Sequence, residues 1–299
     1  MNDLVLDLAL NSPFEETQKA FAENKDWKIR NSVAKNKNIF PSILIILSKD
    51  NSIHVRKLVA KNPKCTPELL EDLLNDEEER NKTRLFQDDI IVLIAKNPSA
   101  SSSLLENILK IYYGISSIVD ALISNPNLSS ELIHKIITNH HIQFYSETLV
   151  KIAKHPRTSE ETFRELIDSK MMEDPYLRNV LAQNPNLPSD CLYMLAMRTK
   201  ETSTHYWIAK HPNCPMSLMK KYCKRHNNLY ALAQNPKLPE SIALEIIKSN
   251  EERGIPNQEA YFEALIFNPK ATKKVLEIII EKGDKEMISK AKNKLRRLK

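Results

Sequence analysis

Glycine is scarce in this sequence, with only three among 299 residues. Phosphate-cradling loops and dinucleotide-binding turns need several glycines close together, so neither kind of site is expected. The four cysteines form no Cys-x-x-Cys pair, which argues against both a disulfide framework and a closed zinc site. The sequence therefore predicts no cofactor and fits a reducing compartment.

Long apolar runs and a recognisable targeting segment are also missing. The longest apolar stretch, around residues 43–47, is far shorter than the roughly 20 residues that cross a bilayer. The N-terminal stretch lacks the basic region of a signal peptide and carries Asp3 and Asp7 instead. We therefore expect a cytoplasmic protein without a membrane partner.

The positive charge of the chain is confined to its C-terminal end. Hydrophobic residues make up 41% and charged residues 27%, as in a folded soluble protein. Residues 285–299 hold seven basic residues and one acidic residue, a net charge that equals the +6 of the whole chain. The rest of the chain is therefore neutral overall.

A recurring Asn-Pro or His-Pro dipeptide marks an internal repeat. Its first residue is Asn62, Asn97, Asn125, His155, Asn184, His211, Asn235 or Asn268. Asn36, followed by lysine, is a further copy, and Asn11 would mark a worn first one. We call this residue the corner of each repeat.

Aligning the copies on the corner predicts two helices in each repeat. The residue three before the corner is always aliphatic, and the residue two before it is mostly alanine. Proline ends this first helix, helix A, at the corner. A Ser, Thr or Pro shortly afterwards begins helix B, which is apolar at paired spacing, as in Leu69, Leu70, Leu73 and Leu74.

These patterns predict an all-α fold, an α-solenoid of about nine two-helix repeats, which we expect to form a right-handed superhelix. One domain spans 1–299, with a degenerate N-terminal repeat or cap over 1–28, repeats over 29–283 and a basic amphipathic capping helix over 284–299. We expect longer loops at the charged insertions 76–84 and 249–258, and helix B on the inward face.

The sequence VAKNPKCTPELLEDLL, residues 59–74, resembles the leucine-rich-repeat variant family, as does the Val55-Arg56 pair before it. Similar stretches cover roughly residues 29–280. The repeats are longer than is usual in that family, so the chain also resembles HEAT-like helical repeat proteins. Either resemblance implies an array that offers an extended binding surface to varied targets.

A lysine column precedes the corner at Lys35, Lys61, Lys96, Lys154 and Lys210. It could form a basic stripe that binds phosphates or an acidic peptide. We favour the alternative that each lysine complements the negative end of its own helix. Three arginines stand six before the corner, Arg30, Arg56 and Arg178. They could reach a ligand, but we expect them to pair with acids of the preceding repeat.

The aromatic candidates are Trp27, Tyr206 and Trp207. Trp207 could line a groove, although we expect core packing for both tryptophans. A HEAT-like DNA glycosylase would need an acid beside such an aromatic side chain, and Glu201 is the nearest in sequence.

Two other groups of side chains are predicted to have structural roles. His140 and His141 lack a third ligand, so no metal site is predicted. His155 and His211 occupy the asparagine position and should be structural. The cysteines fall in core columns and should be small buried hydrophobes.

The C-terminal segment carries one apolar stripe, Ile288, Ala291, Leu295 and Leu298. This stripe predicts a cap for the last repeat, with Asp284 capping the helix. The cations Lys290, Lys292, Lys294, Arg296, Arg297 and Lys299 would form its solvated side. They could also serve as a basic arm for nucleic acid.

The sequence favours a non-enzymatic scaffold that binds a protein or peptide partner on its concave surface. The alternative is nucleic-acid binding through the lysine column and the basic tail. A HEAT-like DNA glycosylase is a more distant third hypothesis.

Overall fold

The computed structural model describes residues 2–81, 89–138, 146–253 and 258–298. Within these residues the regular structure is entirely helical, which confirms the all-α class. The chain forms two compact units, residues 1–157 (unit 1) and residues 158–299 (unit 2). None of the described helices is long and apolar enough to cross a membrane.

Unit 1 alternates between A helices, which carry odd numbers, and B helices, which carry even numbers. Its A helices are α1 (Asn2–Asn11), α3 (Trp27–Ala34), α5 (Ile53–Lys61), α7 (Asp89–Lys96), α9 (Ser116–Ile123) and α11 (Ser146–Lys154). Its B helices are α2 (Glu15–Ala22), α4 (Pro41–Ser48), α6 (Pro67–Asn81), α8 (Ser102–Ile111) and α10 (Ser130–Thr138).

Unit 2 continues the alternation and includes one short 3₁₀ helix, η1 (Lys170–Glu173). Its A helices are α13 (Pro175–Gln183), α15 (Thr202–Lys210), α17 (His226–Ala233), α19 (Gln258–Phe267) and α21 (Lys285–Arg297). Its B helices are α12 (Glu160–Asp168), α14 (Ser189–Arg198), α16 (Met216–Cys223), α18 (Glu240–Arg253) and α20 (Lys273–Lys282).

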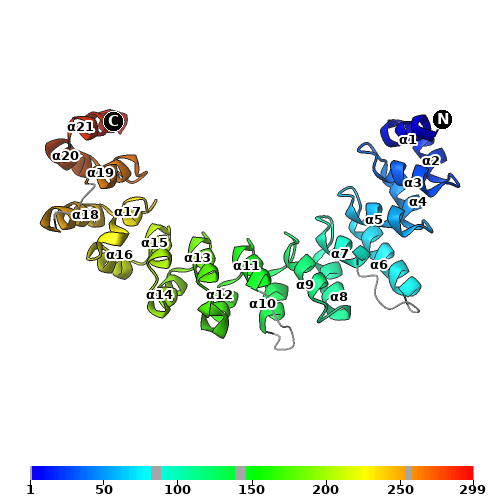
Figure 1. The fold of residues 1–299 in the computed structure, drawn as a ribbon, viewed down its shortest axis with the longest axis horizontal. Coiled ribbons are helices and arrows are strands. Elements are labelled where there is room, and N and C mark those ends of the chain that lie inside the picture. The colour runs from blue at the N-terminus through cyan, green and yellow to red at the C-terminus, as the bar shows by residue number, and fades with distance from the viewer. Residues whose placement is uncertain (1, 82–88, 139–145, 254–257, 299) are drawn as a thin grey trace. The chain divides into compact units, whose positions relative to one another are not determined.

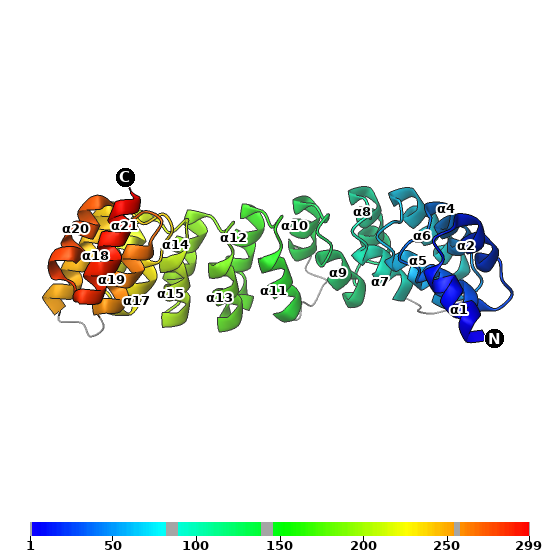
Figure 2. The same cartoon turned by 90° about the horizontal axis from the view of Figure 1, so that it is seen from above.

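In each unit the A helices form one row and the B helices a second row (Figures 1 and 2). Successive A helices, such as α5 and α7 or α13 and α15, pack together more closely than successive B helices. The alanine column explains this spacing, because Ala60, Ala95, Ala182 and Ala209 are buried where the A helices meet. The A row therefore lies on the inner side of each unit, which differs from our expectation that helix B faces inward.

Most corner asparagines are buried and tie their repeat to the one before it, whereas Asn62 is half-buried and makes only the turn bond. Asn125 Nδ2 donates to the carbonyl oxygen of Ala95 at 2.7 Å and to that of Asn97, the preceding corner, at 2.9 Å. Its Oδ1 accepts the backbone N–H of Asn127 at 2.9 Å. The same three bonds, between 2.7 and 2.9 Å, recur at Asn97, Asn235 and Asn268. One amide thus satisfies a turn and joins two repeats.

Histidine replaces asparagine at two corners and reproduces this pattern, which confirms its structural role. His211 Nδ1 accepts the backbone N–H of Asn213 at 3.0 Å, so in the neutral ring the proton lies on Nε2. That Nε2 donates to the carbonyl oxygen of Asn184, the preceding corner, at 2.7 Å. His155 does the same with the N–H of Arg157 and the carbonyl oxygen of Asn125.

The first corner is Ser12, not Asn11. Ser12 precedes Pro13, its Oγ accepts the backbone N–H of Phe14, and its carbonyl oxygen accepts Asn36 Nδ2 at 2.9 Å. Asn11 instead donates to its own helix at Asp7. The prediction was wrong by one residue because it required asparagine, whereas a serine hydroxyl also accepts the turn N–H.

The arginine column connects consecutive helices, and its carboxylate partners come later in the chain. Arg56 Nη1 donates to the carbonyl oxygen of Asp50 at 2.7 Å, and its guanidinium pairs with Glu77 of α6. Arg30 pairs with Asp50, which follows α4, and Arg178 pairs with Glu201, just before α15. The predicted pairing with acids is confirmed, but their expected place in the preceding repeat is wrong.

The two charged insertions are partly helical. Residues 76–81 extend α6, and residues 249–253 extend α18. The expectation of loops over these residues was therefore wrong, since Glu and Arg are good helix formers. Residues 82–84 and 254–257 of the two insertions lie outside the described residues.

The four cysteines are buried and unpaired, as their columns predicted. Burial raises the pKa of the Cys65, Cys191, Cys214 and Cys223 thiols to about 12. They are therefore protonated at neutral pH, and nothing about them resembles an activated nucleophile.

Helix α21 packs against α19 and α20. Asp284 caps it by accepting the Met287 N–H at 2.7 Å, as predicted. The inner face is centred on buried Met287 and Ala291, whereas Ile288 and Leu295 are half-buried and Leu298 is 47% exposed. The apolar stripe is therefore only partly covered.

Replacing Asn125 with alanine should lower the free energy of unfolding by about 2–4 kcal/mol, because two buried carbonyl groups and one turn N–H lose their partner. Asn62 is the matched control, since it keeps the turn bond to the Lys64 N–H and makes no bond to the preceding corner. Asn62→Ala should cost clearly less. Urea denaturation measures both, and equal costs would contradict the role assigned to the corner amide.

Candidate binding surface

The C-terminal ends of the A helices and the corners that follow them form one edge of each unit, which we call the A-row edge (Figure 2). This edge carries the lysine column and, in unit 2, Trp207. The corner bonds fix its geometry, because they hold equivalent positions of successive A helices side by side. Side chains just before the corner are then free to vary.

In unit 1 the A-row edge is basic. The column there holds Lys35, Lys61, Lys96 and Lys154, which are all exposed and form no ion pair or side-chain hydrogen bond with the described part of the chain. By contrast, Lys49 and Lys57, which lie outside the column, pair with Asp76 and Asp89. The lysine column of unit 1 therefore fits both of its predicted roles. Each lysine can complement the negative end of its own helix, and together the lysines can form a basic stripe.

In unit 2 the same edge is hollowed around Trp207. A hollow of about 400 Å³, the Trp207 hollow, lies across the ends of α13, α15 and α17. It is lined by Ala182, Gln183, Trp207, Lys210, His211, Pro212, Gln234 and Pro236. We had expected Trp207 to pack in the core. The structure instead places it on an open surface, where it lines this hollow.

Neighbouring side chains hold the indole in place. The Tyr206 ring meets the Trp207 ring edge to face, with ring centroids 5.4 Å apart. Lys210 Nζ lies 5.8 Å from the Trp207 ring centroid, within the range of a cation–π contact. The Tyr206 hydroxyl donates to Gln234 Oε1 at 3.4 Å, which connects α15 to α17. The structure thus brings together three of the predicted residues, Tyr206, Trp207 and Lys210.

Two glutamines, which sequence reasoning left out of the site, offer hydrogen bonds at the hollow. Gln183 Nε2 donates to the carbonyl oxygen of Asn179 at 3.1 Å, which leaves Gln183 Oε1 as an acceptor on the surface. Gln234 accepts from Tyr206 and keeps its Nε2 as a donor. The signal was present in the sequence, because both glutamines stand in the lysine column.

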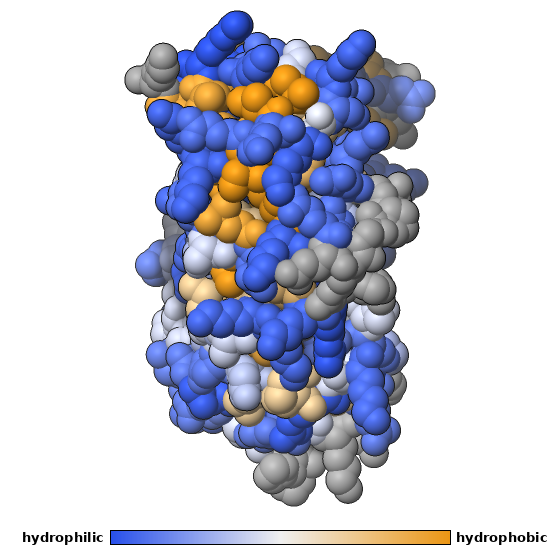
Figure 3. Space-filling view, turned by 90° about the vertical axis from the view of Figure 1, so that its left-hand side faces the viewer, coloured by the Kyte–Doolittle hydropathy of each residue, from blue (hydrophilic) through white to orange (hydrophobic). Residues whose placement is uncertain are grey.

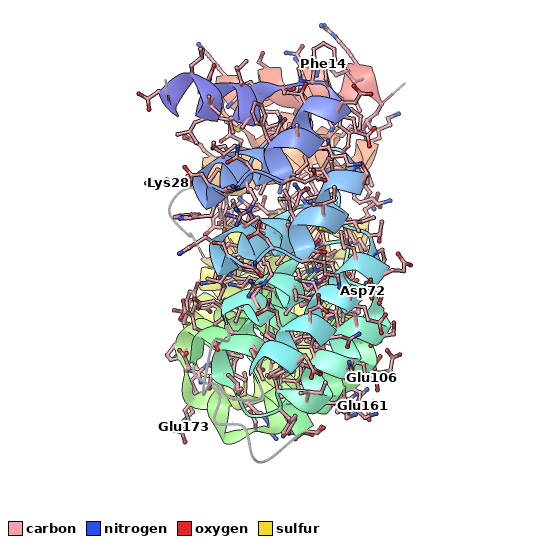
Figure 4. All side chains as sticks on the ribbon, turned by 90° about the vertical axis from the view of Figure 1, so that its right-hand side faces the viewer. Phe14, Lys28, Asp72, Glu106, Glu161 and Glu173 are labelled. Atoms are coloured by element: carbon pink, nitrogen blue, oxygen red, sulfur yellow. The ribbon has the colours of Figure 1, made fainter. Side chains whose placement is uncertain are left out.

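Carboxylates are absent from the central A helices of unit 2. No Asp or Glu occurs in α13, α15 or α17, whereas α12, α14, α18 and α20 of the B row each contain at least one. Unit 1 lacks this separation, because α7 and α9 of its A row contain Asp89 and Asp120. Figure 4 shows exposed Lys28 of α3 on one side of this unit and Asp72 of α6 on the other. The A-row surface around Trp207 therefore favours anionic groups.

A second hollow of about 310 Å³, the Phe267 hollow, lies between the C-terminal halves of α19 and α21. It is lined by Ile266, Phe267, Lys290, Asn293, Lys294, Arg297 and Leu298. Phe267 is 63% exposed and stands in the lysine column of its repeat. Figure 3, which views the C-terminal end of the chain, shows apolar side chains between hydrophilic ones.

The tail cations have different surroundings. Lys290, expected on the solvated side, pairs with Glu263 of α19 at 2.6 Å and with Glu286 at 2.7 Å. Among the residues that the structure describes, no ion-pair partner is found for Lys292, Lys294, Arg296 or Arg297, and Lys294 is half-buried. Lys299 lies outside the described residues.

Trp27 is separate from both hollows. It lies at the start of α3, is 40% exposed and stacks on His54 with ring centroids 5.1 Å apart. The prediction of core packing is wrong here as well, because the first residue of a helix lies beyond the closely packed alanine positions near its end.

Neither hollow is lined by a carboxylate. No Asp or Glu lines the Trp207 hollow, and Glu201 is bonded to Arg178 instead. Among the described residues no group of three or more His, Cys, Asp or Glu side chains could hold a metal ion. His140 and His141 lie outside these residues.

Comparison with known proteins assigns the chain to no family. No family model matches the chain, and no curated protein matches it.

Burial lowers the pKa of His211 and of His155, although a backbone carbonyl beside each ring opposes the shift. Burial therefore makes both rings neutral over a wider pH range in the folded chain than in the unfolded chain. As the pH falls below the ordinary value of about 6.5, the unfolded chain binds protons that the folded chain does not, so stability falls.

The double variant His155→Asn/His211→Asn should therefore lose less unfolding free energy between neutral pH and mildly acidic pH than the original chain. Asparagine keeps the corner bonds and does not titrate. Urea denaturation at several pH values measures the difference. Parallel pH profiles for the two chains would contradict the assignment of neutral corner histidines.

Proposed function

We propose that this protein is a non-enzymatic, cytoplasmic scaffold that binds a protein or peptide partner on its A row. The repeats of each unit would stack as an α-solenoid, and we propose that this solenoid is a right-handed superhelix. Support comes from the tight A-row packing, the corner bonds between repeats and the four unpaired, buried thiols.

The observation that carries this proposal is the Trp207 hollow. Tryptophan, tyrosine and arginine dominate the binding energy of protein interfaces, especially where they line a pocket. Here a half-buried indole and a half-buried phenol stand beside the amides of Gln183 and Gln234. Such amides match the donors and acceptors of a peptide backbone, while the aromatic rings accommodate an apolar side chain.

Peptides selected from a random displayed library on the full chain should depend on the Trp207 hollow. We expect Tyr206→Ala to weaken their binding about tenfold or more, since it removes the ring that supports Trp207 and the bond to Gln234. Isothermal titration calorimetry with the enriched peptides measures this change.

Tyr193→Ala is the matched control for this selection. Tyr193 is 45% exposed on B helix α14 of the same unit, so its loss should leave binding unchanged. A selection that enriches no peptide, or peptides that bind equally well to both variants, would contradict the proposed surface.

A second candidate function is nucleic-acid binding, which the lysine column of unit 1 favours. Lys35, Lys61, Lys96 and Lys154 are exposed without acidic partners. The tail adds Lys292, Arg296 and Arg297. Such cations would bind phosphates in a salt-dependent manner.

Fluorescence anisotropy with labelled single- and double-stranded DNA and RNA tests this candidate. If the column binds phosphates, Lys61→Ala/Lys96→Ala should weaken binding and reduce the salt slope by roughly one for each lost contact. Lys49→Ala, which removes a lysine already paired with Asp76, should change little. Replacing Lys292, Arg296 and Arg297 with alanine separates the tail's contribution. No binding near physiological salt would remove this candidate.

A HEAT-like DNA glycosylase has the least support. Such an enzyme would need an acid beside the exposed aromatic side chain, and the residues that line the Trp207 hollow include none.

A further inference from the structure

The Trp207 hollow and the Phe267 hollow lie on the same A-row edge of unit 2. The first lies across the ends of α13, α15 and α17, and the second between the ends of α19 and α21. These five A helices follow one another in the row, with α15 packed on α17, α17 on α19 and α19 on α21. A ligand that follows the edge therefore meets both hollows in succession.

The two hollows share one chemistry. Each has a large aromatic side chain, an amide, and a cation that forms no ion pair. These are Trp207, Gln234 and Lys210 in the first hollow and Phe267, Asn293 and Arg297 in the second. Neither is lined by a carboxylate. The repetition indicates two pockets for apolar side chains, each beside a position for an anionic group.

The stretch between the hollows also lacks negative charge. Helix α17 contains no Asp or Glu, and exposed Lys237 and Lys270 stand just beyond the corners Asn235 and Asn268. The C-terminal half of α19 contains one carboxylate, Glu263, and this carboxylate pairs with Lys290. An acidic chain would thus find complementary charge along its whole path.

The spacing of the helices sets the length of such a ligand. Neighbouring packed helices lie about 8–10 Å apart, so two to three intervals separate the hollows by roughly 20–25 Å. An extended peptide advances about 3.3 Å per residue, so about seven residues would connect the two pockets.

We propose that the partner of this edge is an extended acidic peptide segment with two aromatic or long aliphatic side chains about seven residues apart, each with Asp or Glu beside it. One side chain occupies the Trp207 hollow and the other the Phe267 hollow. This inference rests on the proposed function and deepens it, since it names the class of partner.

The test uses fluorescein-labelled synthetic peptides in which two Glu-Trp-Glu anchors are joined by Gly-Ser spacers. Fluorescence polarisation with the full chain should show tightest binding when the tryptophans are about seven residues apart, and at least tenfold weaker binding at about three residues. A peptide with Lys-Trp-Lys anchors at the best spacing should bind at least tenfold more weakly than its acidic counterpart.

Charge reversal on the protein provides the matched variants. Lys210→Glu and Arg297→Glu alter surface groups that form no ion pair, so the fold should be kept, which circular dichroism checks. Each should weaken the acidic peptide at least tenfold, and the double variant should bind the Lys-Trp-Lys peptide better than the original chain does. Lys220→Glu, at an exposed position of B-row helix α16, should have no effect.

The proposal is overturned if no labelled peptide binds, if acidic and basic peptides bind equally, or if binding does not depend on spacing. The random-library selection distinguishes this failure from failure of the proposed function. If basic or single-anchor peptides are enriched and depend on Tyr206, the scaffold function stands and this inference falls. If the selection also enriches none, both fall.

Discussion

The buried side chain of the corner residue is the interaction on which the rest of the structure depends. At most corners the asparagine amide, or the histidine ring, accepts the N–H of its own turn and donates to the carbonyl oxygen of the preceding corner, whereas Asn62 makes only the turn bond. The bond fixes both where helix A ends and where the next helix A lies. Alanine at the meeting point of these helices allows the close approach that the bond requires.

This arrangement separates structural positions from variable ones. The aliphatic column, the alanine column and most corner residues are buried, whereas the side chain just before the corner lies outside the core. In unit 1 this position holds four lysines besides Asn11 and Ser124, and in unit 2 it holds two glutamines, Lys210 and Phe267. One framework thus presents two chemically different edges, a basic one and an aromatic one with amides.

The residue types that recur at equivalent positions of the repeats could be recognised from the sequence. The contacts that these side chains make with neighbouring helices could not. Apolar periodicity and the Asn-Pro corner predicted the helices, the buried cysteines and the corner role of His155 and His211. Periodicity alone did not reveal that Trp207 lies open or that Arg56 reaches forward to Glu77, because both depend on the packing of neighbouring helices. Ser12 was missed because an alignment on residue identity overlooks a different side chain that makes an equivalent bond.

The direction of the corner bonds has a consequence for how such an array grows. The corner amides donate backwards, each to the carbonyl oxygen of the preceding corner, at Asn97, Asn125, Asn235 and Asn268. A segment copied from one corner to the next therefore carries one donor and one matching acceptor. Tandem duplication of that segment would insert a repeat with no orphaned polar group at either seam, whereas a copy cut elsewhere would leave a buried amide or carbonyl unpaired. The intervals of 24 to 35 residues between corners show that the helices within a segment can vary in length while this joint is kept.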